Sequence, residues 1–303
     1  MSLEVKKIFQ FSGHSSAVYC LEKGQTNQSF FSGSGDHFVA EWNHETLAPE
    51  KFSVKLEHSV YSLCFLQAQK TILIGDSAGG MHVLDLEAKK EIRHLILHHN
   101  GVFCIRNIQS KGLIVSAGAE GSVCILRNSD YKLMLQIPLS TKKVRKIALN
   151  LDESLMAIAD GEGMIRIFDT EFFNELHTFF AHEGGASSIA WHPSENVLLS
   201  GGKDAHLRFW DAEKDFSMIR EIAAHNFNIY DIAFSPNGRW CATASRDKTV
   251  KIWDARSFDM PLRLDRKSYM AHQNSVNCLL WCESTGYLIS SGDDRMINLW
   301  EVK

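Results

Sequence analysis

The chain has 303 residues, of which 45% are hydrophobic and 22% are charged, and its formal net charge is −4. This near balance of 32 basic and 36 acidic residues does not favour nucleic-acid binding through a generally basic surface. No stretch approaches the roughly 18 apolar residues of a membrane helix, and the N-terminal segment lacks the apolar core of a signal peptide. We therefore expect a soluble, cytoplasmic protein that is monomeric on its own and binds neither nucleic acid nor membrane.

The first segment with the character of a strand is 5–11, and it precedes a Gly13-His14 pair. After it, large apolar residues recur along the chain at nearly constant spacing. We call this series the apolar ladder and its residues the rungs. Four steps of the ladder are 42 residues long, and the last two are 43 and 47. Its rungs are Trp42, Leu84, Leu126, Phe168, Trp210, Trp253 and Trp300. A period of about 40–45 residues is typical of β-propeller blades, and seven such units fill the chain, so we expect a single domain over 1–303.

The sixth unit shows the elements that we expect in every blade. Apolar and small residues alternate over 231–234 and 240–245, on either side of a turn that contains Pro236 and an Asn-Gly pair. A second reversal at 246–248 leads to a third strand over 249–254, and a fourth strand leads to the next unit. Four short antiparallel strands, repeated seven times, predict an all-β, seven-bladed β-propeller.

The spacing of polar residues within the units resembles that of a WD40-repeat protein, and the resemblance extends from about Val5 to Lys303. In that family a histidine, a hydroxyl residue, an aspartate and a tryptophan form a hydrogen-bonded tetrad in a blade. The histidine here precedes the aspartate by 22 residues and the tryptophan by 28 in four units. The matching residues are His14, Ser32, Asp36 and Trp42; His182, Ser200, Asp204 and Trp210; His225, Thr243, Asp247 and Trp253; and His272, Ser290, Asp294 and Trp300.

Physical chemistry supports a structural role for these sets. A buried indole N–H needs an acceptor, a hydroxyl supplies one, and the hydroxyl can donate in turn to a histidine that reaches an aspartate. His225, Thr243 and Asp247 also resemble a nucleophilic catalytic set. An active site is single, however, whereas this arrangement recurs four times. We therefore expect no catalytic residues, no enzymatic activity and no cofactor.

Three units depart from the pattern. The second has Ala78 where the aspartate belongs, the third has Glu120, and the fourth has Ser140 and Glu162 in place of the histidine and the aspartate. One interpretation is that the tetrads of these units are dispensable and have lost residues, because neighbouring blades support a blade with a weakened tetrad. The alternative is that blades two to four lost their tetrad residues because these blades bind a partner.

The two ends of the sequence predict how the propeller closes. The chain ends three residues after Trp300, so the last unit has no fourth strand of its own. We expect segment 5–11 to complete that blade and so to remove an exposed sheet edge.

The cysteines and histidines do not predict a metal site or a disulfide. The seven cysteines contain no CxxC pair, and Cys20, Cys104 and Cys278 lie in the same register of apolar strand patterns, so we expect buried thiols. The histidines outside the tetrads, including His37, His44 and His82, are scattered along the sequence.

The resemblance implies that partners engage the top face of the propeller, around its central channel. Three registers of the repeat are expected to project there. The second register contributes Tyr19, Tyr61, Phe103, Arg145, Ser187, Tyr230 and Asn277, the first contributes Lys143, and the third contributes Lys203, Arg246 and Asp293. Aromatic residues thus gather on blades one to three and six, and basic residues on blades four to six.

This distribution leads to a hypothesis about function. We expect a non-enzymatic scaffold that binds a peptide or protein, with an apolar anchor over the aromatic half and an acidic or phosphorylated part over the basic half. In one alternative, the aromatic side chains pack against loops and the chain is a structural subunit held by blade edges or the bottom face. A further alternative is small-molecule binding or catalysis at the central channel. Lesser docking candidates are the basic insertion between Trp253 and His272 and the Phe172-Phe173 pair.

Overall fold

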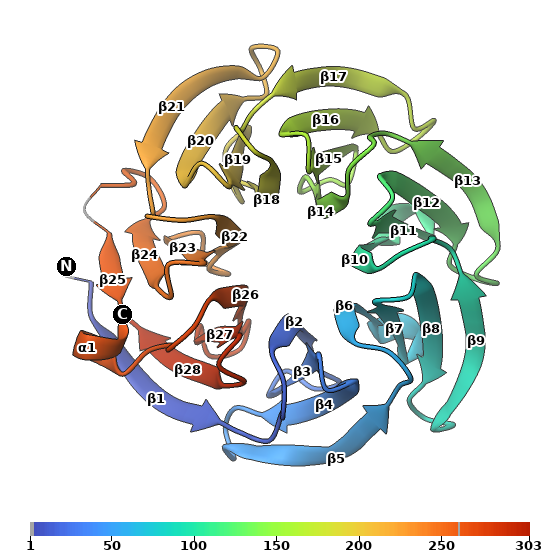
Figure 1. Cartoon of the computed structure of the whole chain (residues 1–303), viewed down its shortest axis with the longest axis horizontal. Helices are drawn as coiled ribbons and strands as arrows, with labels where there is room; N and C mark the ends of the chain where they lie inside the picture. Colours follow the sequence, from blue (N-terminus) through green and yellow to red (C-terminus); the bar gives the residue numbers. More distant parts are fainter. Residues whose placement is uncertain (1–2, 260) are drawn as a thin grey trace. The chain divides into compact units, whose positions relative to one another are not determined.

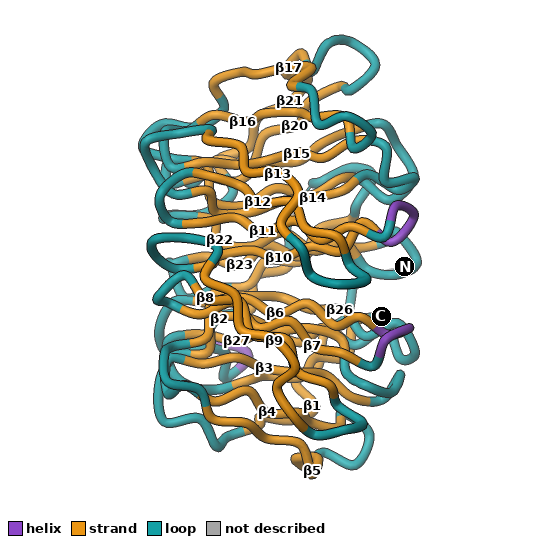
Figure 2. Tube along the Cα trace, turned by 90° about the vertical axis from the view of Figure 1, so that its right-hand side faces the viewer, coloured by secondary structure: helices purple, strands orange, loops and turns teal. Residues whose placement is uncertain are grey.

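The computed structural model describes residues 3–259 and 261–303 and is an all-β, seven-bladed propeller with four antiparallel strands in every blade (Figure 1). Strands dominate the trace, and the helical turns are short (Figure 2). Within the described ranges, no helix is long and apolar enough to cross a membrane. The chain divides into two compact units, Met1–Val60 with Ile229–Lys303, and Tyr61–Asn228. We call them unit one and unit two and describe each by itself; a single domain over 1–303 stays a prediction.

Unit one contains the sheets of blades one, six and seven. Blade one consists of β2 (Val18–Lys23), β3 (Ser29–Ser34), β4 (Phe38–Asn43) and β5 (Ala48–Lys55). Blade six consists of β22 (Ile229–Phe234), β23 (Trp240–Ser245), β24 (Val250–Asp254) and β25 (Leu262–Leu264). Blade seven has the order β1 (Val5–Phe11), β28 (Ile297–Val302), β27 (Leu288–Gly292) and β26 (Val276–Trp281). The helix α1 (Arg266–Tyr269) follows β25, and the Asp265 side chain caps its first turn by accepting the Ser268 N–H.

Blade seven is completed by the N-terminal strand, as the sequence predicts. β1 runs antiparallel to β28, from the pair Val5 and Val302 to the pair Phe11 and Ile297. The pairing continues beyond β1, because Glu4 N donates to Lys303 O at 3.1 Å and Lys303 N donates to Glu4 O at 3.0 Å. The segment therefore joins the two ends of the sequence in one sheet.

Unit two contains the sheets of blades two to five. Blade two consists of β6 (Val60–Leu66), β7 (Thr71–Asp76), β8 (Gly80–Asp85) and β9 (Lys90–Ile96), with the turn η1 (Gln67–Gln69) after β6. Blade three consists of β10 (Val102–Ile108), β11 (Leu113–Gly118), β12 (Ser122–Arg127) and β13 (Leu133–Pro138), with η2 (Gln109–Lys111) after β10. Blade four consists of β14 (Val144–Leu149), β15 (Leu155–Asp160), β16 (Met164–Asp169) and β17 (Glu175–Phe180). Blade five consists of β18 (Ala186–Trp191), β19 (Val197–Gly202), β20 (His206–Asp211) and β21 (Ser217–Ala223).

The core lies between neighbouring sheets within each unit, because both faces of the inner strands are covered. All six residues of β7 are buried, whereas β9, the outer strand of the same blade, is mostly exposed. Rungs of the apolar ladder belong to these layers: Leu126 packs with residues of blades two and three, and Phe168 with residues of blades three and four. All seven cysteines are buried, and none forms a disulfide.

The turn between the second and third strands of the blades needs a left-handed residue. Glycine supplies it in blades two to four, as Gly79, Gly121 and Gly163, with φ of 94° to 97°. In the four blades with a tetrad aspartate the same place is taken by His37, Ala205, Lys248 and Arg295, with φ of 65° to 74°. The tetrad aspartate braces such a turn, since Asp204 Oδ1 accepts the N–H of His206 and Asp294 Oδ1 that of Met296.

Candidate functional site

Blades one, five and seven each contain a complete hydrogen-bonded tetrad. In blade five, Trp210 Nε1 donates to Ser200 Oγ at 2.8 Å, and His182 Nε2 lies 2.7 Å from the same oxygen. His182 Nδ1 lies 2.9 Å from Asp204 Oδ1. Because a carboxylate only accepts, Nδ1 carries the proton, and the hydroxyl donates to Nε2. The same chain runs through His14, Ser32, Asp36 and Trp42 in blade one and through His272, Ser290, Asp294 and Trp300 in blade seven.

Blades six and three share interactions of the tetrad. In blade six, Trp253 Nε1 donates to Thr243 Oγ1 at 3.0 Å. In blade three, His98 Nδ1 lies 2.6 Å from Glu120 Oε1 and its Nε2 lies 2.9 Å from Ser116 Oγ. Blade three, which departs from the sequence pattern, therefore keeps two of the three hydrogen bonds of a tetrad, with a glutamate in the role of the aspartate. Only the indole is missing, because Leu126 takes its place.

Burial and ion pairing set the charges of the blade-five tetrad. Burial lowers the pKa of His182, so the imidazole is neutral at pH 7. Burial raises the pKa of Asp204, but hydrogen bonds from His182 and Arg208 outweigh it and hold the pKa well below its usual range. The chain of donors is thus fixed in one direction, from indole to carboxylate.

A β-bulge positions the candidate binding residues. In blade one and in blades three to seven, the pairing of the first two strands skips one residue, as between Val102 and Cys104 in blade three and between Val144 and Lys146 in blade four. The skipped residues are Tyr19, Phe103, Arg145, Ser187, Tyr230 and Asn277. A bulge turns its extra residue away from the regular alternation of a strand. These are second-register residues that the sequence analysis assigned to the top face.

In unit two, the candidate residues form a continuous row. The rings of Tyr61 and Phe103 are stacked, with centroids 5.3 Å apart and planes at 9°. The guanidinium carbon of Arg145 lies 5.1 Å from the centroid of Phe103, and Lys143 Nζ lies 5.7 Å from it. Both distances are those of a cation–π contact. The structure thus brings the aromatic and the basic candidates together through Phe103.

The basic end of this row concentrates positive charge. Burial lowers the pKa of Lys143, and the charges of Arg145 and Lys203 lower it further. Lys203 is exposed, whereas Lys143 and Arg145 are half-buried. We call Tyr61, Phe103, Lys143, Arg145 and Lys203 the aromatic–basic row. Because its cations repel one another, an anion bound there would gain more than at a single lysine.

In unit one, the candidate residues differ in their exposure and contacts. Tyr19 is 36% exposed and lies beside Gly35, where an added Cβ would be 3.1 Å from the ring. Tyr230 is half-buried and Arg246 is exposed. Asn277 Nδ2 donates to Val18 O and to Asp293 Oδ1. The side-chain amide of Asn277 is therefore already hydrogen-bonded within the protein.

Other features lie away from the row. A pocket of about 450 Å³ is lined by Asn150, Leu155, Trp191 and His192, among others, at the opposite ends of β14 and β18 from their bulges. Phe172 is 76% exposed, while its neighbour Phe173 packs on the core of blades three and four.

One group of side chains has the composition of a metal site. Asp76, His82 and His94 offer three ligand atoms that all lie within 4.8 Å of one another. Burial lowers the pKa of His82, but hydrogen bonds to Asp76 and Glu91 outweigh it and place the pKa above its usual value. The sequence analysis treated His82 as scattered and did not single out Asp76 or His94, since nothing in the spacing shows that the three meet.

Comparisons with known proteins agree with the geometry. A family model described as "WD domain, G-beta repeat" matches residues 5–43, 173–211, 216–254 and 265–301, just over half of the chain. The "Protein transport protein sec13" of Aspergillus fumigatus is 25% identical over an alignment of 280 positions that covers 79% of this chain and 87% of that protein. The "Cilia- and flagella-associated protein 52" of Mus musculus is 23% identical over 295 residues, 97% of this chain and 46% of that protein. The "WD repeat-containing protein slp1" of Schizosaccharomyces pombe is 24% identical over 184 residues, 60% of this chain and 34% of that protein.

Proposed function

Because the chain belongs to the WD40 repeat family, we propose that it is a non-enzymatic scaffold that binds a peptide or protein segment through its aromatic–basic row. The observation that carries the proposal is the contact of Arg145 and Lys143 with Phe103, which joins an apolar platform to a group of cations. Tyrosine and arginine are enriched at interface hot spots, and a flat ring loses little conformational entropy on binding.

The chemistry of the row suggests the nature of its ligand. An apolar side chain of the partner would lie over Tyr61 and Phe103, where the stacked rings offer a broad surface. An acidic or phosphorylated side chain would follow over Lys143, Arg145 and Lys203, where arginine can form paired, charge-assisted hydrogen bonds.

The relatives support a role in protein assemblies. One is named for protein transport and another for association with cilia and flagella. One fold hosts many functions, so the site and not the fold has to identify the partner. The second candidate function is that of a structural subunit held by blade edges or by the bottom face. In that case, the pocket beside Trp191 could receive a side chain of the neighbouring subunit.

The proposal is tested by purifying the tagged chain with its partners from the source organism and quantifying them by mass spectrometry. The test variant is Arg145→Glu, and the triple variant Tyr19→Ala, Arg145→Glu, Tyr230→Ala extends it to unit one. Arg220→Glu is the matched control, because Arg220 is an exposed arginine on the outer strand β21.

We expect a partner that wild type and Arg220→Glu recover and that both Arg145→Glu variants lose. Direct titration of the identified peptide, with and without phosphate, then measures the affinity. Partners that survive in the Arg145→Glu variants but fall with Arg220→Glu would contradict the proposal and favour the edge of the blades.

A further inference from the structure

We propose that blade two contains a binding site for a divalent transition metal of the zinc class, with Asp76, His82 and His94 as its protein ligands. The three side chains come from three adjacent strands: Asp76 ends β7, His82 lies in β8 and His94 lies in β9. The site is separate from the aromatic–basic row, and its proposal does not depend on the scaffold function.

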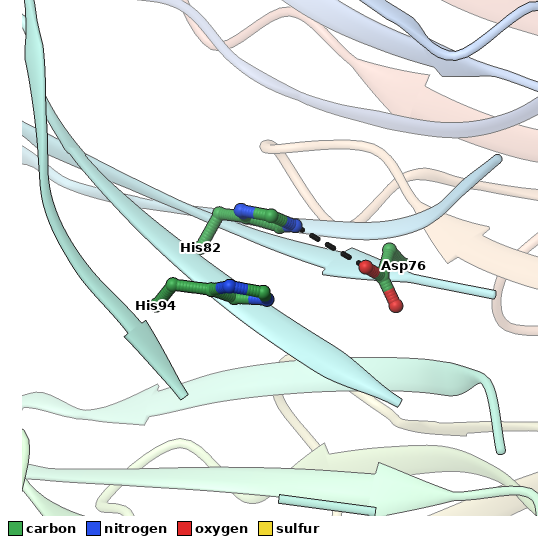
Figure 3. A group of neighbouring side chains, drawn as sticks. All are labelled: Asp76, His82 and His94. Atoms are coloured by element: carbon green, nitrogen blue, oxygen red, sulfur yellow. Dashed lines mark hydrogen bonds and ion pairs between the residues drawn. The ribbon is translucent and has the colours of Figure 1, made fainter. Parts of the chain in front are cut away.

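The two imidazoles are arranged as a pair of ligands. His82 and His94 are direct cross-strand neighbours in the β8–β9 ladder. Their rings are stacked, with centroids 4.1 Å apart and planes at 8°. Figure 3 shows one ring above the other, with both directed toward the carboxylate of Asp76. Parallel rings on adjacent strands thus present their nitrogen atoms on the same side.

The separation of the ligand atoms is close to what zinc needs. His82 Nε2 lies 3.2 Å from Asp76 Oδ2, and all three ligand atoms lie within 4.8 Å of one another. Bonds of 2.0–2.1 Å in a tetrahedron place two ligands about 3.3 Å apart. Asp76 and His82 already meet this separation. His94 is exposed, so a small rotation of its side chain can close the remainder.

Gly80 lets the backbone lie close to the ligand atoms. A Cβ on Gly80 would lie 2.7 Å from His94 Nε2 and 2.8 Å from Asp76 Oδ2, so any side chain there would crowd these two ligands. The other carboxylate oxygen, Asp76 Oδ1, accepts the N–H groups of Ala78 and Gly80, each at 2.8 Å. These bonds hold the carboxylate with Oδ2 toward the imidazoles.

Glu91 supplies the outer partner that metal-binding histidines usually have. His82 Nδ1 lies 2.7 Å from Glu91 Oε1, and because the carboxylate only accepts, Nδ1 carries the proton. Without a metal, Nε2–H can donate to Asp76 Oδ2, 3.2 Å away. A metal ion that displaces this proton would meet the lone pair of Nε2 beside Asp76 Oδ2. A carboxylate that orients a histidine toward a metal is the common arrangement of such sites.

Blade four shows what the same positions do without histidine. The residues equivalent to Asp76, His82 and Glu91 are Asp160, Arg166 and Glu175, each 84 positions later. There, Arg166 Nε lies 3.6 Å from Asp160 Oδ2, and its Nη1 lies 3.4 Å from Glu175 Oε2. Arg166 pairs across the strands with Thr178, the equivalent of His94.

The comparison between the blades defines the difference in chemistry. Arginine balances the buried aspartate of blade four with a permanent charge that cannot ligate a metal. In blade two, histidines take the places of both the arginine and the threonine, and their imidazoles can ligate a metal. Two nitrogen ligands and one carboxylate oxygen favour zinc over magnesium or calcium, which prefer oxygen ligands, and a water molecule would complete the tetrahedron.

The experiment is calorimetric titration of ZnCl₂ into the untagged, chelator-treated chain, repeated with Co²⁺, whose d–d absorption reports tetrahedral coordination. The test variants are His82→Arg and His94→Thr, which copy blade four and so introduce residues that this environment accepts elsewhere. Glu91→Gln tests the outer partner, and His99→Thr is the control, because His99 is exposed and outside the group.

We expect one zinc per chain in the wild type and in His99→Thr. His82→Arg and His94→Thr should weaken binding by more than about tenfold, and Glu91→Gln by about tenfold. Zinc should also raise the Tm of the wild type and not that of His94→Thr. Zinc binding that persists in both test variants would overturn the proposal. A wild type that binds no zinc would overturn it as well and would leave Asp76 and His82 as an ion pair like that of blade four.

Discussion

Arg145 and Phe103 belong to neighbouring blades, yet the guanidinium carbon of the first lies 5.1 Å from the ring centroid of the second. Both residues are the extra residues of β-bulges, in β14 and β10. The repeated bulge therefore brings a cation and an aromatic ring together that are 42 residues apart in the sequence. The contact gives the aromatic–basic row its two chemical halves.

Replacing Phe103 by leucine should separate recognition from stability. Phe103→Leu keeps an apolar side chain but removes the ring face that Tyr61, Lys143 and Arg145 contact. We expect the affinity for the partner segment to fall by about tenfold or more, whereas the free energy of unfolding changes by about 1 kcal/mol or less. Calorimetric titration and urea unfolding measure the two quantities. Unchanged affinity would exclude Phe103 from the interface.

Serine variants in two blades should differ in stability. Ser200→Ala leaves two buried groups without their partner, Trp210 Nε1–H and His182 Nε2, and should cost about 2–4 kcal/mol. Ser116→Ala leaves only His98 Nε2, because Leu126 has no polar group, and should cost about 1–2 kcal/mol. Urea unfolding of the pair measures the difference. Equal costs would show that the indole bond adds nothing in blade five.

Substitutions of the left-handed turn residues should change stability by different amounts in two neighbouring blades. An added Cβ at Gly163, where φ is 94°, would lie 2.0 Å from His182 O, so Gly163→Ala should destabilise the chain by more than about 1 kcal/mol. Ala205 has φ of 65° in the equivalent turn of blade five. Ala205→Gly relieves left-handed strain but adds chain entropy, so the net change should stay within about 1 kcal/mol. Thermal unfolding of both variants checks the contrast.

The blade-five tetrad predicts a pH dependence of stability. The pKa of His182 is lowered below its usual 6.5, since burial opposes the charged form. The unfolded chain then binds a proton that the folded chain does not, so this contribution to stability is present above pH 6.5 and is lost as the pH falls below it. The depressed pKa of Asp204 adds a second loss as the pH falls below its usual 3.8. NMR titration of the His182 imidazole should give a midpoint below 6.5, and a midpoint at or above that value would contradict the assignment.

Much of the fold could be read from the sequence, because each rung of the ladder is a local signal. Trp300 ends an apolar run close to the C-terminus, and this alone indicated that the last blade needed a strand from elsewhere. β1 supplies that strand, and Phe11 packs in the same core layer as Ile297 and Trp42. The spacing of histidine and tryptophan likewise indicated which residues share a hydrogen-bonded tetrad, since both positions are set by strand length.

The contacts across strands and blades could not be read in the same way. His82 and His94 are twelve residues apart, and they face each other only because the β8–β9 register shifts between Val83 and Leu84. The same shift lies just before Leu126, Phe168 and Trp210 in blades three to five, but the spacing of these residues along the sequence does not reveal it. A pair of neighbouring ligands therefore looked like two unrelated histidines. The stacking of Tyr61 on Phe103 depends on the relative tilt of two sheets, which a repeat period does not determine.

The pairing of β1 with β28 also determines how the molecule responds to force. The first pair of the ladder, Val5 with Val302, lies next to the hydrogen bonds between Glu4 and Lys303, so the two ends of the chain leave the sheet at the same place. Tension applied between the ends would load these hydrogen bonds one after another, which is the unzipping geometry. In the shear geometry, by contrast, all of them would be loaded at once. Blade seven, which ties the ends together at rest, is therefore the part of the protein that we expect to open first under load.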